Sequence, residues 1–363
     1  MKIKVNKEKM LSILQPMQFV AAGRHGLPVA NNVRLEAADG QLTMLGTDGD
    51  LTVRVHAEAE VLEGGATTLP PKQLLVVFGD MGAAEAELTV DADQHGFITA
   101  ANERYRISGL PADQFPALPA VEGAQTFTLE QSALKNMFRL TAYAAVAGTD
   151  RPLLNSVLMG FADGKLSMVA TDSRRLALVE QEVVMEPGTQ ANVIVPLKTV
   201  HQLMSMLGDE GTVEVKANDR QASFSFGGVE IVTKQMEGKY PNYRQVIPQG
   251  ATVRATMERE TFLAAVRRTS RALMGTVGGV KLNFKPNQLE VEANGEAGEA
   301  YEILDVKYDG PELSISFNPA FLMDPLKALT TDEVYLDLSD DMNPGTMRSS
   351  VNFVYVLMPI RLS

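Results

Sequence analysis

The sequence predicts an α+β protein made of three tandem copies of one domain, each with two helices packed on antiparallel sheets. Three observations support this prediction: a hairpin-turn motif that recurs at a fixed interval, a strand–proline–helix motif after each turn, and helices with one apolar face. The copies occupy residues 1–121, 122–249 and 250–363, with seams at proline-rich stretches. A chain of 363 residues has room for two or three domains of ordinary size.

The hairpin turns carry the repeat most clearly. Asp39–Gly40 lies between two alternating apolar runs, and Asp163–Gly164 repeats it 124 positions later. Pro286–Asn287 fills the corresponding place in the third copy, in a weaker form. Asx-Gly pairs between such runs are typical of tight β-hairpins. We therefore expect each copy to contain antiparallel strands joined at these turns.

Each hairpin is followed by a strand that ends near a proline and by a short helix, around Pro70, Pro196 and Pro319. Each copy also opens with a helix whose apolar residues recur at i, i+3, i+4 and i+7, the spacing of one helix face. The opening stripes contain Met10, Ile13, Leu14 and Met17; Leu134, Met137 and Phe138; and Phe262, Ala265 and Val266. Thr128 and Gln131 are spaced as a capping box for the second of these helices.

The composition is that of a soluble globular protein, with 45% hydrophobic and 21% charged residues. No apolar run is long enough for a membrane span, and the first residues lack the apolar stretch of a signal peptide. The absence of cysteine excludes disulfides and thiolate chemistry and is consistent with a cytoplasmic protein. The net charge of −12 argues against nucleic-acid binding unless the basic residues gather on one surface.

No enzymatic motif is complete, so we expect a non-catalytic protein without a cofactor. The stretch Gly160–Leu166 resembles a P-loop but is one residue short and has Leu where Ser or Thr is required. The four histidines, His25, His56, His95 and His201, lack metal-ligand spacing, which predicts no metal site. Asp48 and Asp172 recur after a hairpin, and this symmetry favours turn-stabilising hydrogen bonds over a catalytic pair of carboxylates.

Basic residues concentrate on the predicted helices, although no third of the chain is basic overall. They lie off the apolar faces, so the helices could present a positive surface while the strands carry the acidic residues. Weak, scattered phosphate contacts of this kind would tolerate sliding, because contacts to base edges would impose a sequence preference. Ordinary solvated helix faces remain an alternative interpretation of any single one of these residues.

Several local motifs resemble the bacterial DNA polymerase III beta subunit, the sliding-clamp family, over essentially the whole chain. Each motif is short, but their order and spacing are specific to the family. The matching stretches are Gly64–Pro70, Leu110–Pro116, Ala170–Ala177, Tyr240–Arg244, Glu302–Val306 and Met358–Leu362.

The resemblance implies a head-to-tail homodimer that forms a ring around double-stranded DNA, without sequence preference, and acts as a polymerase processivity factor. Implied partners are DNA polymerase III alpha and other polymerases, a clamp loader that supplies ATP, and mismatch-repair and other proteins with clamp-binding motifs. Two alternatives remain open. One is a duplicate clamp specialised for repair or antibiotic self-protection, and the other is a peptide-binding scaffold that does not load on DNA.

The family also has a hydrophobic peptide-binding groove between its second and third domains. The positions that match it are Leu154, Thr171, Arg175, Leu176, Pro241, Val246, Asn318, Phe321, Val356, Met358, Pro359 and Arg361. Two departures affect peptide preference: Ser173–Arg174 replaces a frequent Gly-His pair, and Gln245 stands where Arg is frequent.

Arg24 matches a DNA-contacting loop position of the family. The basic residues of the predicted helices are expected to contact DNA with it; they are Lys72, Lys135, Arg139, Lys198, Arg267 and Arg271. The resemblance also implies a dimer interface. In the interface, Tyr105 and Ile107 are expected on an edge strand facing Leu273 and Met274 of the second subunit. Core packing of Tyr105 and Ile107 in their own strand is an equally good interpretation.

Overall fold

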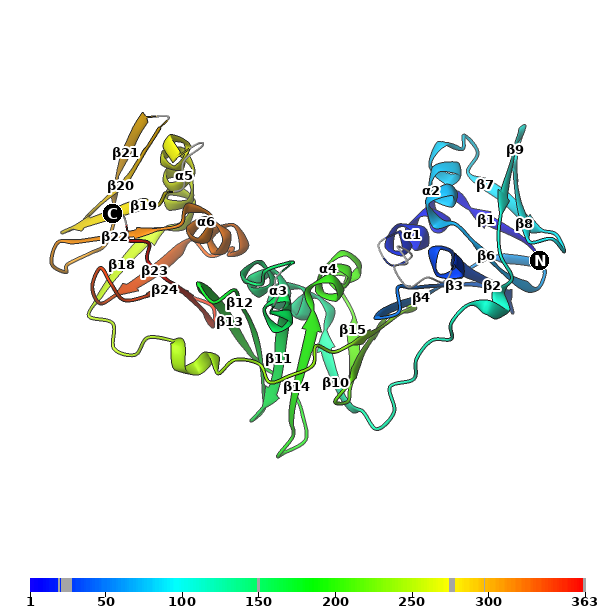
Figure 1. The fold of residues 1–363 in the computed structure, drawn as a ribbon, viewed down its shortest axis with the longest axis horizontal. Coiled ribbons are helices and arrows are strands. Elements are labelled where there is room, and N and C mark those ends of the chain that lie inside the picture. Colours follow the sequence, from blue (N-terminus) through cyan, green and yellow to red (C-terminus); the bar gives the residue numbers. More distant parts are fainter. Residues whose placement is uncertain (19, 21–27, 149–150, 274–277, 297, 362–363) are drawn as a thin grey trace. The chain divides into compact units, whose positions relative to one another are not determined.

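A computed structural model describes the chain except residues 19, 21–27, 149–150, 274–277, 297 and 362–363. The chain divides into two compact units, residues 1–135 with 198–235 and residues 136–197 with 236–363. Each unit contains an eight-stranded sheet, a smaller sheet and helices packed on them (Figure 1). The boundary falls inside the central predicted domain, so the compact units do not coincide with the sequence repeats.

The first unit has a five-stranded sheet of order β5-β1-β7-β8-β9 and an eight-stranded sheet of order β10-β15-β16-β17-β4-β3-β2-β6. All neighbouring strands are antiparallel. The strands are β1 (Lys2–Asn6), β2 (Val33–Ala38), β3 (Gln41–Thr47), β4 (Leu51–Glu58), β5 (Glu60–Glu63), β6 (Gly65–Leu69), β7 (Glu85–Val90), β8 (His95–Ala100), β9 (Glu103–Ser108), β10 (Gln125–Glu130), β15 (Thr212–Ala217), β16 (Gln221–Phe226) and β17 (Val229–Lys234).

The second unit has an eight-stranded sheet of order β14-β11-β12-β13-β25-β24-β23-β18 and a four-stranded sheet of order β21-β20-β19-β22. These strands are also antiparallel. They are β11 (Ser156–Ala162), β12 (Lys165–Thr171), β13 (Arg175–Glu182), β14 (Gln190–Pro196), β18 (Val253–Glu258), β19 (Val280–Lys285), β20 (Gln288–Gly295), β21 (Gly298–Asp305), β22 (Leu313–Phe317), β23 (Glu333–Leu338), β24 (Gly345–Ser349) and β25 (Phe353–Leu357).

Each eight-stranded sheet takes four strands from one sequence repeat and four from the next. In the first unit, β17 of the central repeat pairs with β4 of the first. In the second unit, β13 of the central repeat pairs with β25 of the third. A continuous hydrogen-bonded sheet therefore spans each seam between repeats. For this reason the boundary between the two compact units falls inside the central repeat.

The α-helices occur in pairs, one pair for each repeat. Their bounds are α1 (Lys7–Met17), α2 (Pro71–Asp80), α3 (Gln131–Thr141), α4 (Leu197–Met206), α5 (Arg259–Thr269) and α6 (Pro319–Ala328). In the first unit α1 packs against α2 and against strands β1 and β4 (Figure 1). In the second unit α5 packs similarly against α6 and against strands β18 and β21. Helices α1 and α5 thus each contact strands of two different sheets.

The apolar stripes of the opening helices are confirmed as buried faces. Met10 and Leu14 of α1 and Phe262 and Val266 of α5 are at most 1% exposed. Asn6 caps α1 by accepting the backbone N–H groups of residues 8 and 9. The predicted capping box of α3 is wrong, because Thr128 pairs within β10 and α3 begins only at Gln131.

The predicted hairpin turns are confirmed by backbone geometry. Asp39 and Gly40 have φ of 50° and 75°, and Asp163 and Gly164 have φ of 52° and 74°. These left-handed conformations match the twist of flanking antiparallel strands, and Asp and Gly adopt them at low cost. In the third copy Asn287, with φ of 58°, joins β19 to β20. Among the described residues no helix is long and apolar enough to cross a membrane.

Candidate functional site

A groove of about 450 Å³ lies in the second unit, where β13 meets β25. Leu176 and Val356 are direct cross-strand partners and both line it, so their side chains lie on the same face of the sheet. The other lining residues come from the segment before β11, the β12–β13 turn, the linker after Tyr240, the start of β24 and the end of β25. They are Leu154, Thr171, Ser173, Arg174, Arg175, Pro241, Asn242, Tyr243, Val246, Pro344 and Met358.

A buried apolar cluster supports the groove from below. Leu176, Val356 and Val169 pack in this cluster with Tyr240 of the linker. The hydroxyl of Tyr240 donates to the carbonyl oxygen of Val169 at 3.3 Å, which holds the linker on the sheet. Burial raises the pKa of Tyr240, so its hydroxyl stays protonated and remains a donor. The groove floor is therefore a buried apolar surface, while Val246 and Met358 at its rim are 55% and 46% exposed.

One wall of the groove is the β12–β13 turn, which the carboxylate of Asp172 holds. Its Oδ1 atom accepts the backbone N–H groups of Arg174 and Arg175, both at 2.9 Å. Asp48 holds the corresponding turn of the first repeat, accepting from the N–H groups of residues 50 and 51 at 3.1 and 2.8 Å. The expected role of both aspartates as turn-stabilising residues is confirmed.

Arg175 links this turn to the third repeat. Its guanidinium donates to Asp172 Oδ2 at 3.0 Å, to Asp324 Oδ2 at 2.5 Å and to the carbonyl oxygen of Tyr143 at 2.5 Å. Burial alone would lower the pKa of Arg175, but the hydrogen bond to Asp324 raises it above its ordinary value. The guanidinium also lies 4.3 Å from the ring centroid of Phe321. Arg175 is thus held by hydrogen bonds at the base of the groove, where two carboxylates already pair with its charge.

Eight of the twelve residues predicted for the groove line it together: Leu154, Thr171, Arg175, Leu176, Pro241, Val246, Val356 and Met358. The other four do not contribute to its lining. Asn318 caps α6 through the N–H groups of residues 320 and 321, and Phe321 lies behind the two arginines. Pro359 and Arg361 follow β25 outside the lining.

Five lining residues were not predicted: Ser173, Arg174, Asn242, Tyr243 and Pro344. The first four are sequence neighbours of predicted residues, so their proximity in the chain was an available signal. Pro344 gave no such signal, because the pairing of β24 with β25 brings it to the groove.

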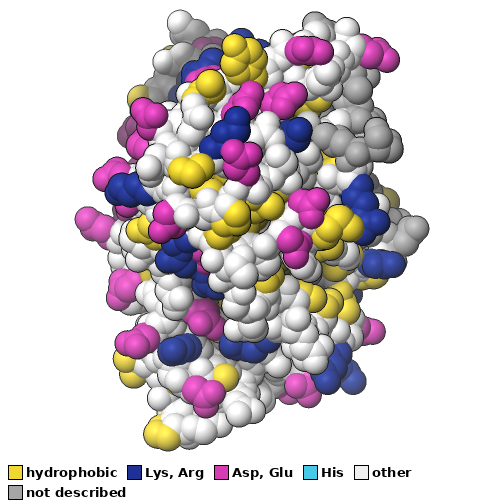
Figure 2. Space-filling model, turned by 90° about the vertical axis from the view of Figure 1, so that its left-hand side faces the viewer, with side chains coloured by type: hydrophobic (Ala, Val, Ile, Leu, Met, Phe, Trp, Pro, Cys, Tyr) yellow, Lys and Arg dark blue, Asp and Glu magenta, His cyan; other side chains and the backbone are white. Residues whose placement is uncertain are grey.

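The basic residues expected to contact DNA, Arg24 excepted, lie on helices or directly after one. Lys72 of α2, Arg267 of α5 and Arg271 after α5 are exposed. Lys135 forms an ion pair with Asp209 at 3.4 Å, and Arg139 donates to Asn136 at 2.6 Å. Lys198 of α4 forms an ion pair with Asp48, and Arg24 lies outside the described residues. On the face that Figure 2 shows, acidic and basic side chains are interspersed, with hydrophobic side chains near the middle.

The residues expected at the dimer interface divide into buried and accessible ones. Ile107 and Leu273 are 3% and 8% exposed in the single chain, and Met274 lies outside the described residues. Tyr105 is half-buried, and its hydroxyl donates to Glu103 Oε2 at 2.7 Å. Tyr301 and Ile303 of the edge strand β21, which were not predicted from the sequence, are 70% and 52% exposed.

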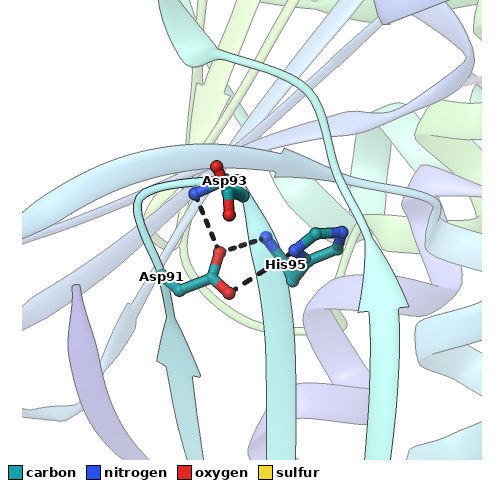
Figure 3. Close-up of side chains that lie close together, drawn as sticks. All are labelled: Asp91, Asp93 and His95. Carbon is teal, nitrogen blue, oxygen red and sulfur yellow. Dashed lines mark hydrogen bonds and ion pairs between the residues drawn. The ribbon is translucent and has the colours of Figure 1, made fainter.

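Asp91, Asp93 and His95 form a cluster of possible metal ligands at the β7–β8 turn (Figure 3). Asp91 Oδ1 accepts the backbone N–H groups of Asp93 at 3.0 Å and His95 at 2.9 Å. The Nε2 atom of His95 lies 2.8 Å from Nη2 of Arg106, so the guanidinium stands where a metal ion would have to bind this nitrogen. These contacts indicate that the cluster is a turn stabilised by Asp91.

Comparison with protein-family models gives three matches in chain order. The DNA polymerase III beta subunit N-terminal domain matches residues 1–119, the central domain 128–242 and the C-terminal domain 244–361. Together these matches span nearly the whole chain, in three tandem copies.

Curated proteins and solved structures agree with the family models. A beta sliding clamp of Pseudomonas putida is 33% identical, covering 99% of both chains, and one of Escherichia coli strain K12 is 31% identical over the full length of both. The crystal structure of the DNA polymerase III beta subunit of Pseudomonas aeruginosa superimposes with a TM-score of 0.93 at 28% identity, covering both chains completely. The Bacillus subtilis sliding clamp gives 0.94 at 25% identity, again with complete coverage.

Proposed function

The chain belongs to the DNA polymerase III beta subunit family and is a DNA polymerase processivity factor, and we propose that it works as a homodimeric ring that slides on double-stranded DNA. In this proposal the groove of the second unit binds short peptide segments of polymerases, a clamp loader and mismatch-repair proteins. The clamp domains are taken as residues 1–121, 122–249 and 250–363. The chain itself is non-catalytic and cytoplasmic, and a separate loader supplies the ATP hydrolysis that opens the ring.

The observation that supports the ring is that the first and the third repeat each have a sheet that ends at an edge strand. The central repeat has two groups of four strands, and each group extends a sheet of a neighbouring repeat. The first and third repeats each retain one smaller sheet, which ends at β9 and at β21. By the repeat pattern, β9 corresponds to β17 and β25, and β21 corresponds to β4 and β13. Pairing β9 of one copy with β21 of another would therefore repeat the two existing seams and close a ring.

The side chains of these edge strands are complementary. Strand β21 exposes Tyr301 and Ile303, a contiguous apolar edge that a partner strand would cover. It also exposes Glu299 and Asp305, whereas β9 exposes Arg104 and Arg106. In an antiparallel pair, an arginine of β9 opposite an acidic residue of β21 on the same face is a favourable cross-strand arrangement. Tyr105 lies between the two arginines in the sequence and is half-buried, so its side chain is on the opposite face of β9 from theirs.

The proposed DNA-contacting residues on or beside the helices are Lys72, Lys135, Arg139, Lys198, Arg267 and Arg271. Arg24, which lies outside the described residues, is proposed with them from the family resemblance. Arg267 supports the assignment most directly, because it is exposed on the side of α5 away from buried Val266 and Phe262. Lys198 supports it least, because Asp48 already neutralises its charge. A net charge of −12 disfavours tight DNA binding and suits a protein that is held on DNA by its topology.

The groove is suited to peptides rather than to small polar substrates. Its floor is apolar, and Met358 at the rim can adapt its shape to different side chains. A solved clamp of Pseudomonas aeruginosa, a relative of this chain, is bound to griselimycin. We infer that the groove of this chain receives a peptide partner, with Leu154, Leu176, Val246, Val356 and Met358 as its apolar contacts.

The first test is retention on DNA. The protein is loaded onto nicked circular plasmid with its cognate loader and ATP, and the plasmid is then linearised. A ring should remain on the circle and slide off the free ends. Failure to load, or equal dissociation from circular and linear DNA, would favour a peptide-binding scaffold that does not encircle DNA.

A further inference from the structure

The groove has a counterpart in the first unit with the same backbone geometry. The turn Thr47–Leu51 and strand β17 correspond, 124 positions earlier, to the turn Thr171–Arg175 and strand β25. The backbone N–H of Lys234 donates to the carbonyl oxygen of Asp50 at 2.9 Å. In the groove the N–H of Met358 donates to the carbonyl oxygen of Arg174, also at 2.9 Å. Residues 50 and 234 are therefore placed as residues 174 and 358 are.

The side chains at these equivalent positions differ in charge. The carboxylate of Asp50 and the ammonium group of Lys234 form an ion pair at 2.8 Å. In the groove, Arg174 takes the place of Asp50, and Met358 takes the place of Lys234. Within the described part of the chain, no carboxylate lies at ion-pairing distance from Arg174. The rim of the groove thus carries a positive charge that no described carboxylate neutralises.

Local contacts hold Arg174 at the rim without pairing its guanidinium with a carboxylate. Asp172 accepts its backbone N–H, and its guanidinium lies 5.4 Å from the ring centroid of Phe321. Stacking on a ring leaves the edge of a guanidinium free to donate hydrogen bonds. Arg175 differs in this respect, because Asp172, Asp324 and a backbone carbonyl engage its donors. Arg174 is exposed and lines the groove, so a ligand can reach its donors.

We propose that Arg174 determines specificity by binding a carboxylate of the peptide in the groove. The partner is then a peptide whose apolar residues, seated over Leu176 and Val356, neighbour an acidic side chain or its own terminal carboxylate. A guanidinium binds a carboxylate through two parallel hydrogen bonds, which adds geometric selection to charge attraction. This inference rests on the proposed function of the groove, and it names the chemistry of the partner.

Selection from random peptide libraries tests the proposal without assuming a motif. One library displays internal peptides and a second displays peptides with free carboxyl termini, so the two sources of the carboxylate are separated. Both are selected against the full-length protein, the Arg174→Gln variant and the Arg244→Gln variant. Arg244 is a matched control, because it is exposed beside the groove but already pairs with Glu180 at 3.2 Å.

Wild type and Arg244→Gln should enrich acidic residues, or free carboxyl termini, next to apolar anchors, and Arg174→Gln should lose this enrichment. For a selected peptide, replacing the acid by its amide should weaken binding to wild type about tenfold, and binding to Arg174→Gln less than about twofold. Equal acid enrichment by wild type and Arg174→Gln would overturn the role of Arg174. Peptides that bind the Leu176→Ala, Met358→Ala double variant as tightly as wild type would instead overturn the groove assignment itself.

Discussion

Asp48 and Lys198 form an ion pair that joins the β3–β4 turn of the first repeat to helix α4 of the central repeat. Burial alone would raise the pKa of Asp48, but the hydrogen bonds from Lys198 and from two backbone N–H groups lower it below its ordinary value of 3.8. The folded state thus binds a proton at this carboxylate less readily than the unfolded chain does. Its contribution to stability is present above the unfolded pKa and is lost as pH falls through the folded pKa.

Replacement of Asp48 by Asn should therefore destabilise the protein in a pH-dependent manner. We expect a loss of roughly 1 kcal/mol in unfolding free energy at pH 7, because Lys198 is half exposed and water screens the pair. The difference from wild type should shrink as pH falls below about 4. Urea unfolding at several pH values measures it, with Asp219→Asn in an exposed turn as the control. A difference that stays constant down to pH 2 would contradict this account.

The Leu176→Ala, Met358→Ala double variant should abolish binding of groove-directed peptides while the dimer remains intact. Leu176 is 3% exposed, so the variant should also lose roughly 2–5 kcal/mol of stability. Leu282→Ala in the four-stranded sheet is a matched control that creates a cavity away from the groove. Fluorescence anisotropy with a selected peptide measures affinity, and sedimentation measures assembly. Normal peptide affinity in the double variant would refute the groove assignment.

Ser173→Gly should stabilise the protein. Ser173 has φ of 75°, a left-handed conformation that costs a non-glycine residue about 1–2 kcal/mol, and its equivalent in the first repeat is Gly49 with φ of 90°. Glycine removes this strain but adds unfolded-state entropy, which leaves a net gain of roughly 0.5 kcal/mol. Thermal unfolding measures the effect. Ser314→Gly in strand β22 should lower the unfolding temperature instead, and a decrease in both variants would argue against strain at Ser173.

Charge reversal at Arg267 should weaken retention on DNA, since this exposed side chain on α5 is proposed to face the phosphates. We expect retention on nicked circular plasmid to fall several-fold, and to fall further with added salt. Combining it with reversal at Arg24 should deepen the loss. Lys165→Glu makes the same charge change on an exposed strand position and should leave retention unchanged. Equal retention of the Arg267 and Lys165 variants would show that the DNA-facing surface lies elsewhere.

Basic residues at the exposed apolar edge of β21 should prevent dimer formation. Tyr301→Lys with Ile303→Lys would place two positive charges against a partner strand that exposes Arg104 and Arg106, and like charges on facing strands are destabilising. Sedimentation should show a shift from dimer to monomer with a normal circular dichroism spectrum. Val184→Lys, at a side chain that is 97% exposed, controls for added surface charge. Persistence of the dimer in the double variant would contradict pairing through β21.

Local sequence patterns were sufficient to predict the buried helix faces and the hairpin turns. The stripes containing Met10 and Phe262 predicted which helix faces are buried, because helical periodicity brings those positions together whatever surrounds them. Asp39–Gly40 and Asp163–Gly164 predicted hairpins, because few residues adopt left-handed conformations at low cost. The resemblance to sliding clamps then placed most of the groove residues, since that resemblance follows short motifs at fixed spacing.

The sequence by itself determined the repeat, the helix faces, the turns and the family, all of which depend on residues close together in the chain or on motif order. Only the tertiary structure decided that the sheets run across the repeat seams, that Pro344 joins the groove and that Ile107 is buried in its own chain. It also decided which arginine has its donors available to a ligand. Arg174 and Arg175 are adjacent and chemically identical. Of these two, only Arg175 donates to Asp324, which lies 149 positions away in the sequence. Charge pairing depends on distance in space, and strand pairing, not sequence separation, sets that distance.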